Sequence, residues 1–327
     1  MPPTIRITAR IERWPVAGAF IIARGAKTHV DVVVVEVSDG VYVGRGEATP
    51  IYYKGETAEG AVETVEALDC DIGRETLQSH LPAGAARNAL DYAFWDLTAK
   101  QQGKPVWQLA GLPAPQPLAT AMTVSLGTPE KMESDARALA AQFAMLKLKL
   151  SGEGDTERVA AVRRGAPTAR LIVDANESWT GRDVAAEAAS LLRYGVELIE
   201  QPVKAGEDHL LDGVRSPIPL AADESCQDRA DLARCKGRYA AINIKLDKAG
   251  GLTEALALKA EAQAMGFEIM VGCMLSTSLG LAPAFLVAQC AKWVDLDGAL
   301  LLVKDREEGF LVEGGMIRPQ DQAHKAE

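Results

Sequence analysis

The sequence predicts an α/β fold in which a small α+β domain precedes a barrel of parallel strands. Three observations support this fold class. The first third of the chain holds a hairpin and two helical segments. The remainder alternates short apolar segments with alanine-rich helical stretches, which is typical of a parallel sheet with helices packed on it. Ionisable residues recur at the ends of those apolar segments, where barrels gather their functional groups.

The composition is that of a soluble globular protein. The chain has 327 residues, 48% of them hydrophobic and 24% charged, with a net charge of −10. This length suits a barrel plus a smaller domain, and the acidic balance argues against nucleic-acid binding. No signal core or membrane-length apolar run is present. The five cysteines form no CxxC pair, so we expect a cytoplasmic protein without a zinc or redox centre of that kind.

The N-terminal third carries hairpin and helix signals. Residues 5–12 alternate weakly as a strand, and "THVDVVVVEVSDGVYVGRGEA" predicts two strands joined at Asp39-Gly40. Helices are predicted over 57–68 and 85–102. The G-x-G of "GRGE" ends a strand and opens no helix, which argues against a phosphate loop. The proline-rich stretch 111–119 is predicted to link two domains.

Eight apolar segments after the linker are the predicted strands of the second domain. They are "LATAMTVSL", "LKLKL", "RLIVDAN", "ELIEQP", "IPLAADES", "AINIKL", "EIMVGCM" and "WVDLDG". The first intervening helix is predicted to begin at Thr128-Pro129-Glu130, with an N-cap, a first-turn proline and an acid. Periodicity alone leaves two architectures open, a closed barrel and an open doubly wound sheet.

The spacing of ionisable residues favours the barrel. One such residue stands at or near the end of most predicted strands: Lys149, Asp174, Glu200, Asp223, Lys245 and Asp297. The first five are separated by 25, 26, 23 and 22 residues, and the last follows after 52, or two further units of 26. Because strand ends of a barrel converge on one mouth, these side chains are expected to share a site.

Three of these residues are carboxylates on consecutive strands. Asp174, Glu200 and Asp223 would repel one another without a cation, and oxygen ligands favour Mg²⁺, with Mn²⁺ as an alternative. The competing interpretation is that they cap the helices that follow. Asn176 and Glu224 lie beside them and are candidates to support the ligands, although Asn176 equally suits a turn.

Lysines flank the carboxylates in the chain. Lys149 lies one strand before them and Lys245 one strand after, which in a closed ring are opposite positions. This arrangement suits removal of a proton from one face of a carbon and its return to the other, provided that the lysine pKa is lowered. Lys147 could lower it and also bind a substrate carboxylate. The simpler alternative for "LKLKL" is an edge strand with both lysines in solvent.

The remaining polar motif is the DxD of "VDLDG". Asp295 and Asp297 lie two apart on one face and could bind a second metal, receive an ammonium group, or form a solvated turn. None of the four histidines lies at a predicted strand end, and no GxSxG elbow is present, which argues against a His base and a Ser hydrolase. Cys273 could line the site or pack as a small apolar residue.

These motifs resemble those of a known family. KxK at Lys147–Lys149, "VDAN", "IEQP", "ADES" and "NIKLDKAGG" resemble the enolase superfamily, muconate-lactonizing subgroup. The DxD motif narrows the resemblance to the dipeptide epimerases, particularly the L-Ala-D/L-Glu type. "FIIARG", "LPAGAARNALDYAFWDL" and "GCMLSTS" are also similar to that type. The resemblance covers nearly the whole chain, and the tail beyond Leu302 is its least diagnostic part.

The resemblance implies a fold and a domain division. The fold is a (β/α)₇β modified TIM barrel under an α+β capping domain. Residues 1–112 would form the first part of the cap, 113–301 the barrel, and 302–327 a segment that returns to the cap.

The resemblance also implies residue roles. Asp174, Glu200 and Asp223 would bind the Mg²⁺ that holds the substrate carboxylate, while Lys149 and Lys245 exchange the α-proton on opposite faces through an enediolate. Asp295 and Asp297 would bind the dipeptide ammonium, and Thr123 the peptide. Arg24 would pair with a glutamate side chain, for which a guanidinium is well shaped, although a surface arginine is the simpler interpretation.

The predicted function is therefore Mg²⁺-dependent epimerisation of L-Ala-D-Glu to L-Ala-L-Glu in murein peptide recycling. The expected partner is a small dipeptide, with no nucleic acid or membrane, and a homo-oligomer would agree with the sequence. Three alternatives remain. One is another enzyme of the subgroup (o-succinylbenzoate synthase, N-acylamino acid racemase or cycloisomerase), the second a Schiff-base aldolase, and the third a non-catalytic metal- or peptide-binding barrel.

Overall fold

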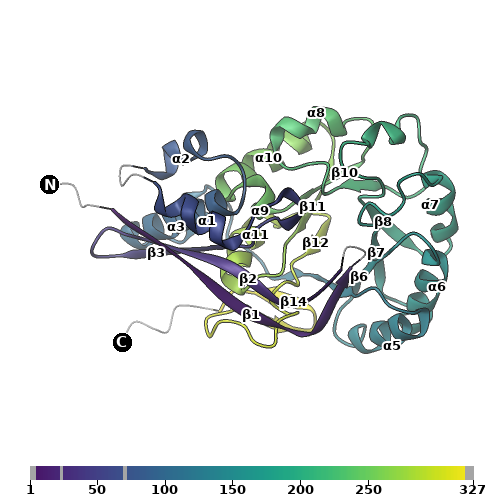
Figure 1. Cartoon of the computed structure of the whole chain (residues 1–327). Coiled ribbons are helices and arrows are strands. Elements are labelled where there is room, and N and C mark those ends of the chain that lie inside the picture. The colour runs from purple at the N-terminus through teal and green to yellow at the C-terminus, as the bar shows by residue number, and fades with distance from the viewer. Residues whose placement is uncertain (1–4, 23–24, 69–71, 321–327) are drawn as a thin grey trace.

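The computed structural model describes residues 5–22, 25–68 and 72–320. The N-terminal part is an antiparallel sheet of β1 (Arg6–Ile22), β2 (Gly25–Ser38) and β3 (Val43–Ala48), in that order. Its helices are η1 (Tyr52–Lys54), α1 (Ala58–Glu66), α2 (Arg74–His80), α3 (Ala85–Gln102) and α4 (Val106–Leu109). Figure 1 shows α1, α2 and α3 gathered beside this sheet at one end of the molecule. The predicted hairpin and both predicted helices are confirmed.

The G-x-G of β3 has a packing role. A Cβ on Gly44 would lie 2.0 Å from the carbonyl oxygen of Ala93, and one on Gly46 would lie 2.0 Å from that of Ala89. Both carbonyls belong to α3, so the helix backbone rests directly on the strand. The glycines allow this close approach, and no phosphate loop is formed.

The second domain is an eight-stranded parallel sheet whose strand order follows the chain. Its strands are β5 (Ala121–Val124), β6 (Met145–Lys149), β7 (Arg170–Asp174), β8 (Val196–Glu200), β9 (Leu220–Ala222), β10 (Ala241–Ile244), β11 (Glu268–Gly272) and β12 (Trp293–Asp295). The Thr123 amide donates to Asp297 and the Leu296 amide to Thr120, both at 2.8 Å, which ties the two ends of the sheet together. The predicted barrel is confirmed, and the open doubly wound sheet is excluded because the strand order never reverses.

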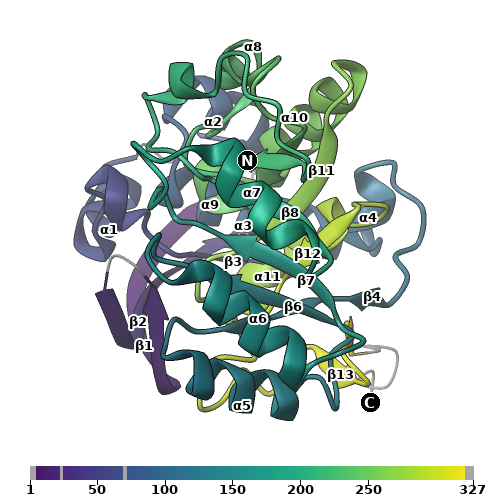
Figure 2. The same cartoon turned by 90° about the vertical axis from the view of Figure 1, so that its right-hand side faces the viewer.

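Helices cover the outside of the barrel. They are α5 (Pro129–Leu139), α6 (Asp155–Gly165), α7 (Val184–Leu192), α8 (Leu232–Cys235), α9 (Leu246–Ala249), α10 (Leu252–Ala264) and α11 (Ser278–Val287), with short 3₁₀ turns η2 (Asp208–Leu211) and η3 (Arg229–Asp231). Figure 2 shows α5, α6 and α7 outside β6, β7 and β8. The predicted N-cap at Thr128 is confirmed, since its side chain accepts from the Lys131 amide.

One predicted helix is missing. Between β8 and β9 the described chain forms the turn η2 and no α-helix. Pro202, Pro217 and Pro219 with Gly206 and Gly213 interrupt this segment, and prolines and glycines oppose helix formation.

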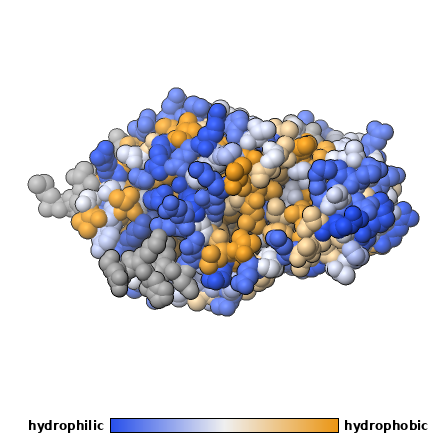
Figure 3. Space-filling view, turned by 90° about the horizontal axis from the view of Figure 1, so that it is seen from below, coloured by the Kyte–Doolittle hydropathy of each residue, from blue (hydrophilic) through white to orange (hydrophobic). Residues whose placement is uncertain are grey.

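The outer helices are amphipathic. In α5 the buried residues are Met132 and Ala136, four apart, while charged side chains face outward. Hydrophilic residues accordingly cover the end of the molecule that carries α5 and α6 in the view from below (Figure 3). Among the described residues, no helix combines the length and apolar character needed to cross a membrane.

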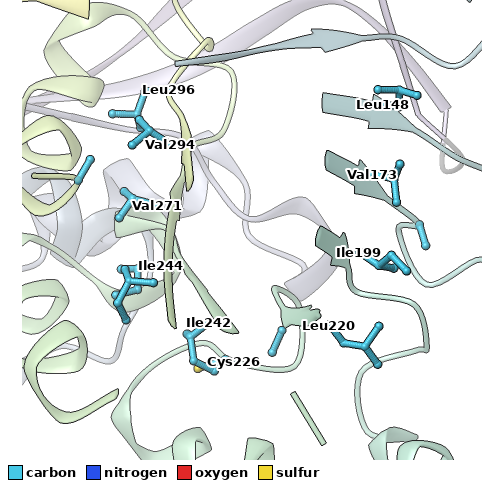
Figure 4. Close-up of a cluster of buried hydrophobic side chains, with 14 of the residues drawn as sticks. Leu148, Val173, Ile199, Leu220, Cys226, Ile242, Ile244, Val271, Val294 and Leu296 are labelled. Carbon is cyan, nitrogen blue, oxygen red and sulfur yellow. The ribbon is translucent and has the colours of Figure 1, made fainter. Parts of the chain in front are cut away.

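Strand alternation divides the barrel residues into two sets. The inner set forms a closed apolar floor with one residue from each strand: Ala121, Met145, Ile172, Leu198, Ala221, Ala241, Met270 and Trp293. The outer set packs against the helices and includes Leu148, Val173, Ile199 and Val271 (Figure 4). This alternation decides which side chains can point into the barrel above the floor.

The C-terminal segment contacts both parts of the molecule. Leu302 pairs with Val16 of β1, and Arg306 lies 2.7 Å from Glu12 and 2.6 Å from Glu47. Farther along, β13 (Leu311–Glu313) and β14 (Met316–Arg318) form a small sheet with β4 (Leu118–Ala119). The predicted linker therefore ends in a strand. The division into 1–112, 113–301 and 302–327 stays a prediction.

Candidate active site

The polar residues of the barrel lie directly above its apolar floor. Two residues after each floor residue comes an inward position, and seven of the eight positions are polar. These positions hold Thr123, Lys147, Asp174, Glu200, Asp223, Asn243, Gly272 and Asp295. Two residues farther along the chain come Lys149 at the end of β6, Lys245 just after β10 and Asp297 just after β12. The leucines of "LKLKL" pack against the helices, so the solvated edge strand is excluded.

The three predicted metal ligands are side by side and buried. Asp174 and Glu200 are paired across β7 and β8, and Asp223 follows β9. Burial opposes ionisation of Asp174, but Lys149 and Lys147 lower its pKa to about 2. Burial and the neighbouring Asp174 raise the pKa of Glu200 to about 7. The nearby lysines thus outweigh burial at Asp174 and lower its pKa, whereas at Glu200 they do not outweigh burial and the charge of Asp174.

The lysines lie against these carboxylates. The ammonium of Lys147 is 2.6 Å from Glu200, 2.8 Å from Asp295 and 3.4 Å from Asp174. Lys149 lies 2.7 Å from Asp174, and Lys245 lies 2.6 Å from Asp223. The predicted site residues therefore form two ion-paired groups, one around Lys147 and Lys149 and one around Asp223 and Lys245, and both groups line one cavity.

The predicted lowering of the base pKa is not observed for Lys245. Burial would lower it, but Asp223 and Glu200 outweigh burial and hold the pKa of Lys245 well above its ordinary value. The pKa of Lys147 is raised in the same way, by Asp295 and Glu200 against burial. Sequence reasoning considered the cations near each lysine and overlooked how closely the carboxylates would approach it.

A divalent cation fits the charge and the donors of this site. Among the described residues, no three Asp, Glu, His or Cys side chains stand as a ready metal-binding group, and ammonium groups lie beside the three carboxylates. Even so, the site holds more buried carboxylates than buried lysines. The six carboxylates are Asp174, Glu200, Asp223, Glu224, Asp295 and Asp297, and the four lysines are Lys147, Lys149, Lys245 and Lys248. When all of them are ionised, two negative charges remain. An oxygen-only donor set with this excess suits Mg²⁺.

The DxD motif is buried in the same mouth. Asp295 and Asp297 are each 4% exposed, which excludes the solvated turn. Asp295 pairs with Lys147, whereas Asp297 accepts the Thr123 amide at 2.8 Å. Burial and the neighbouring Asp295 raise the pKa of Asp297 to about 6. A cationic group from a ligand would relieve the repulsion between these two carboxylates.

The two candidate supporting residues also lie at the site. The Asn176 amide donates to Asp174 at 2.9 Å, and Asn176 has a positive φ of 43°, so it is both a turn residue and a contact of Asp174. Glu224 lines the cavity above the carboxylates, as does the half-buried Cys273. Arg24, predicted to bind a side-chain carboxylate, lies outside the described residues.

Three further residues hold the carboxylates or the backbone that carries them, and sequence reasoning missed all three. Gln201 accepts from the amides of Asp223 and Ser225 at 2.8 and 3.0 Å. Lys248 donates to Asp223 Oδ1 at 2.7 Å, and Asn243 donates to Glu200 at 2.7 Å. Asn243 lies in β10 two residues before Lys245, which directly follows the strand, so alternation alone could have placed it inside the barrel.

The cap closes over the mouth. The Ile21 carbonyl accepts from the Leu126 amide at 3.0 Å, which brings the β1–β2 hairpin to the loop after β5. Thr49 donates to the Leu275 carbonyl at 2.7 Å, which joins the end of β3 to the loop after β11. The described cap residues that line the cavity are Phe20, Ile22, Lys27, Tyr52 and Tyr53.

Comparison with known families agrees with this geometry. Residues 4–111 match the mandelate racemase / muconate lactonizing enzyme N-terminal domain, and residues 131–323 match the enolase C-terminal domain-like family. The chain belongs to the enolase superfamily. The resemblance noted from the sequence motifs is thereby confirmed.

Curated relatives of this superfamily member are epimerases and racemases. It is 45% identical over 311 residues to the L-Ala-D/L-Glu epimerase of Escherichia coli (strain K12), covering 94% of this chain and 97% of that protein. It is 42% identical to the N-acetyl-D-glutamate racemase of Pseudoalteromonas sp, covering 88% and 93%. Because these relatives are epimerases and racemases, this superfamily member is an isomerase.

Solved structures of the superfamily share the whole fold. An enolase family member of Agrobacterium tumefaciens with homology to dipeptide epimerases, with bound sodium and L-Ala-L-Glu, superposes with a TM-score of 0.93 at 46% identity, covering 97% of this chain and 98% of that one. A dipeptide epimerase of Enterococcus faecalis complexed with Mg and L-Leu-L-Tyr has a TM-score of 0.89 at 30% identity, covering 97% of each. The modified TIM barrel with a capping domain is confirmed.

Proposed function

We propose that this protein is a Mg²⁺-dependent dipeptide epimerase that inverts the α-carbon of the second residue of L-Ala-D-Glu or L-Ala-L-Glu with two lysines, one that removes the α-proton and one that supplies a proton to the opposite face. The observation that carries the proposal is the placement of Lys149 and Lys245. They project into one mouth from β6 and the end of β10, four strands apart in an eight-stranded ring, with buried carboxylates on the strands between them.

This placement matches the needs of an inversion. One lysine must remove the α-proton from one face of the carbon and the other must deliver a proton to the opposite face. Mg²⁺ held by Asp174, Glu200 and Asp223 would neutralise the substrate carboxylate and so favour loss of the α-proton. Neutralising those carboxylates would also lower the pKa of Lys245, which Asp223 and Glu200 hold above its ordinary value in this structure.

The DxD motif supports a substrate with a free amino group. Lys147 already neutralises Asp295 at 2.8 Å, whereas Asp297 accepts a hydrogen bond from the Thr123 amide and lies buried beside another carboxylate. An incoming ammonium would supply the missing positive charge. The similarity to L-Ala-D/L-Glu epimerase of Escherichia coli supports the choice of dipeptide. We further propose that the activity belongs to murein peptide recycling in the cytoplasm, as the motif resemblance implies.

A second candidate function is racemisation of an N-acylated amino acid. The 42% identity to an N-acetyl-D-glutamate racemase favours it, and it would use the same lysines and carboxylates. An N-acylated substrate has no ammonium, so it leaves Asp297 without a cationic partner. The buried DxD motif therefore favours the dipeptide.

The proposal is tested by following both dipeptides on a chiral column. We expect L-Ala-D-Glu and L-Ala-L-Glu to interconvert, EDTA to stop the conversion, and added Mg²⁺ to restore it. Conversion of N-acetyl-glutamate with no conversion of either dipeptide would favour the second candidate. Turnover that is unaffected by EDTA would contradict the assignment of the three carboxylates to a metal.

A further inference from the structure

Each of the three carboxylates proposed to hold the metal turns one oxygen toward a lysine of the mouth. The contacts are Asp174 Oδ2 with Lys149 at 2.7 Å, Glu200 Oε2 with Lys147 at 2.6 Å, and Asp223 Oδ2 with Lys245 at 2.6 Å. A lysine ammonium sits on a flexible four-carbon stem, so it can move aside when another cation enters. The oxygens that face these lysines are therefore the ones open to a metal ion.

The second oxygen of each carboxylate accepts a hydrogen bond from a fixed donor. The donors are the Asn176 amide to Asp174 Oδ1 at 2.9 Å, the Asn243 side chain to Glu200 Oε1 at 2.7 Å, and the Lys248 ammonium to Asp223 Oδ1 at 2.7 Å. The first donor is backbone, and the other two are buried side chains. A donor that cannot leave competes with a metal ion for the oxygen it holds.

Lys248 differs from the lysines of the mouth in how it is held. Its ammonium also donates to the carbonyl oxygens of Asn243, Cys226 and Asp223, at 3.0, 2.8 and 2.5 Å. An ammonium has three protons, and four acceptors surround this one. Lys248 therefore stays on Asp223 Oδ1 when Lys245 leaves Oδ2.

Asn243 is held by the absence of a neighbouring side chain. A Cβ on Gly272 of β11 would lie 2.8 Å from Asn243 Oδ1 and 2.9 Å from its Nδ2, so the glycine makes the room that the amide fills. Asn243 Oδ1 has no hydrogen-bond partner among the described residues. Burying an unpartnered amide oxygen is costly, and the one hydrogen bond that the structure gives this side chain is to Glu200. The contact with Glu200 is thus what the buried amide contributes.

We infer that Asn243 and Lys248 are positioning residues that restrict Glu200 and Asp223 to one metal-binding oxygen each, and that this restriction makes the site discriminate Mg²⁺ from Ca²⁺. The inference rests on the assignment of the three carboxylates to a metal in the proposed function. Mg²⁺ binds few carboxylate oxygens at short distance, whereas Ca²⁺ accepts up to about eight oxygens and takes both oxygens of one carboxylate readily. A carboxylate with one oxygen already engaged therefore favours the smaller ion.

A purely structural role for these two donors predicts a different outcome. If Asn243 served only to support the barrel interior, its loss would weaken the binding of both cations alike. A positioning role predicts that the cations separate, because Glu200 gains a second free oxygen that Ca²⁺ can use and Mg²⁺ cannot. The ratio of the two dissociation constants distinguishes the roles.

The test measures Mg²⁺ and Ca²⁺ binding by titration calorimetry, without substrate, in the wild type and Asn243→Leu. Leucine has nearly the shape of asparagine and lacks the donor. We expect Mg²⁺ affinity to fall about 10–100-fold, as on loss of a group that orients a metal ligand, and Ca²⁺ affinity to fall less. The ratio of the Ca²⁺ to the Mg²⁺ dissociation constant should therefore drop at least about fivefold.

Asn88→Leu is the matched control. Asn88 is also buried, also donates to a carboxylate, that of Asp247 at 3.0 Å, and also has an Oδ1 without a partner within the described part of the chain. It touches none of the three proposed metal ligands, so the ratio should stay at its wild-type value.

Lys248→Met extends the test to Asp223 and should lower the ratio in the same direction. It leaves several buried carbonyls without a donor, so circular dichroism must show that the variant folds, and Asn243→Leu decides the inference if it does not. Failure of the dipeptide activity leaves these binding measurements intact, which separates the inference from the proposed reaction. Equal losses for both cations in Asn243→Leu, unchanged affinities, a ratio that falls as far in Asn88→Leu, or a wild type that binds neither cation would each overturn the inference.

Discussion

Alternation along single strands accounts for most of the site. On β6 the outward Leu148 packs under the helices, while Lys147 and Lys149 point into the mouth. Strand period alone predicts that the two lysines share a face. It does not predict that Lys147 contacts Asp295, which lies on the last strand and approaches only when the barrel closes. The side of the strand on which each lysine lies could be predicted from the sequence, but the carboxylates that the lysines contact could not.

The two-lysine mechanism makes the first residue-scale prediction. Lys149→Ala and Lys245→Ala should each lower epimerisation by about 10²–10⁴-fold, the usual contribution of a positioned acid–base group. Each variant should retain α-proton exchange for one epimer, on the face that the remaining lysine serves. The measurement is NMR of each pure epimer in D₂O. Normal exchange of both epimers in Lys149→Ala would contradict its assigned role.

The DxD motif makes the second residue-scale prediction. Asp297→Asn keeps an acceptor for the Thr123 amide but removes the charge that an ammonium needs. We expect kcat/KM for L-Ala-L-Glu to fall at least about tenfold, while any turnover of N-acetyl-glutamate changes little. Steady-state kinetics with both substrates checks this. An unaffected dipeptide rate would favour the acyl-amino-acid candidate.

Contacts between whole elements explain features that looked ambiguous in the sequence. The predicted first strand, 5–12, is the start of a much longer β1, because pairing with β2 runs from Arg6↔Ser38 to Pro15↔His29 and resumes after a register shift from Phe20↔Lys27 to Ile22↔Gly25. Weak alternation hid this length, since many β1 side chains are exposed. The extension matters because it carries Phe20 and Ile22 to the cavity, where Lys27 joins them from β2.

The packing of α3 on β3 predicts that neither glycine of β3 tolerates a side chain. Gly44→Ala or Gly46→Ala should destabilise the protein by about 1–3 kcal/mol, as overpacking does, because the new methyl group meets helix backbone that cannot rotate away. Urea denaturation should show a lower midpoint. Gly127→Ala is the control, since its Cβ would meet Lys131 Cγ at 3.5 Å, an ordinary contact. Equal midpoints for Gly44→Ala and Gly127→Ala would contradict the packing argument.

At the scale of the whole molecule, a buried carboxylate joins cap and barrel. Asp247 of α9 accepts from the Thr49 amide at 2.9 Å and from Asn88 of α3 at 3.0 Å. Burial, with Glu56 and Glu47 nearby, raises the pKa of Asp247 from 3.8 to about 7. Because the folded protein holds this proton more tightly than the unfolded chain, the stability it contributes is present at low pH and is lost as the pH rises through about 7.

Asp247→Asn should therefore stabilise the protein in a pH-dependent way. The amide oxygen can still accept both hydrogen bonds, and no charge is buried. We expect the gain in unfolding free energy over wild type to grow between pH 5 and pH 8 by on the order of 1–3 kcal/mol. Denaturation curves at the two pH values measure it. A gain that is the same at both pH values would show that Asp247 does not titrate in this range.

The sequence predicts the strands of the barrel better than it predicts the contacts that bring the cap over the barrel. Spacing and alternation give the eight strands, the shared mouth and the inward lysines. The approach of the cap depends on contacts between distant segments, such as Thr49 with Leu275 and Arg306 with Glu47, which no local pattern encodes.

Deuterium incorporation tests the central claim most directly. The protein is incubated with L-Ala-D-Glu and Mg²⁺ in D₂O, and the α-protons are followed by NMR. Two-lysine proton transfer predicts deuterium at the glutamate α-carbon of the epimerised product and none at the alanine α-carbon. Epimerisation without deuterium in the product, or no deuterium at the glutamate α-carbon at all, would contradict it.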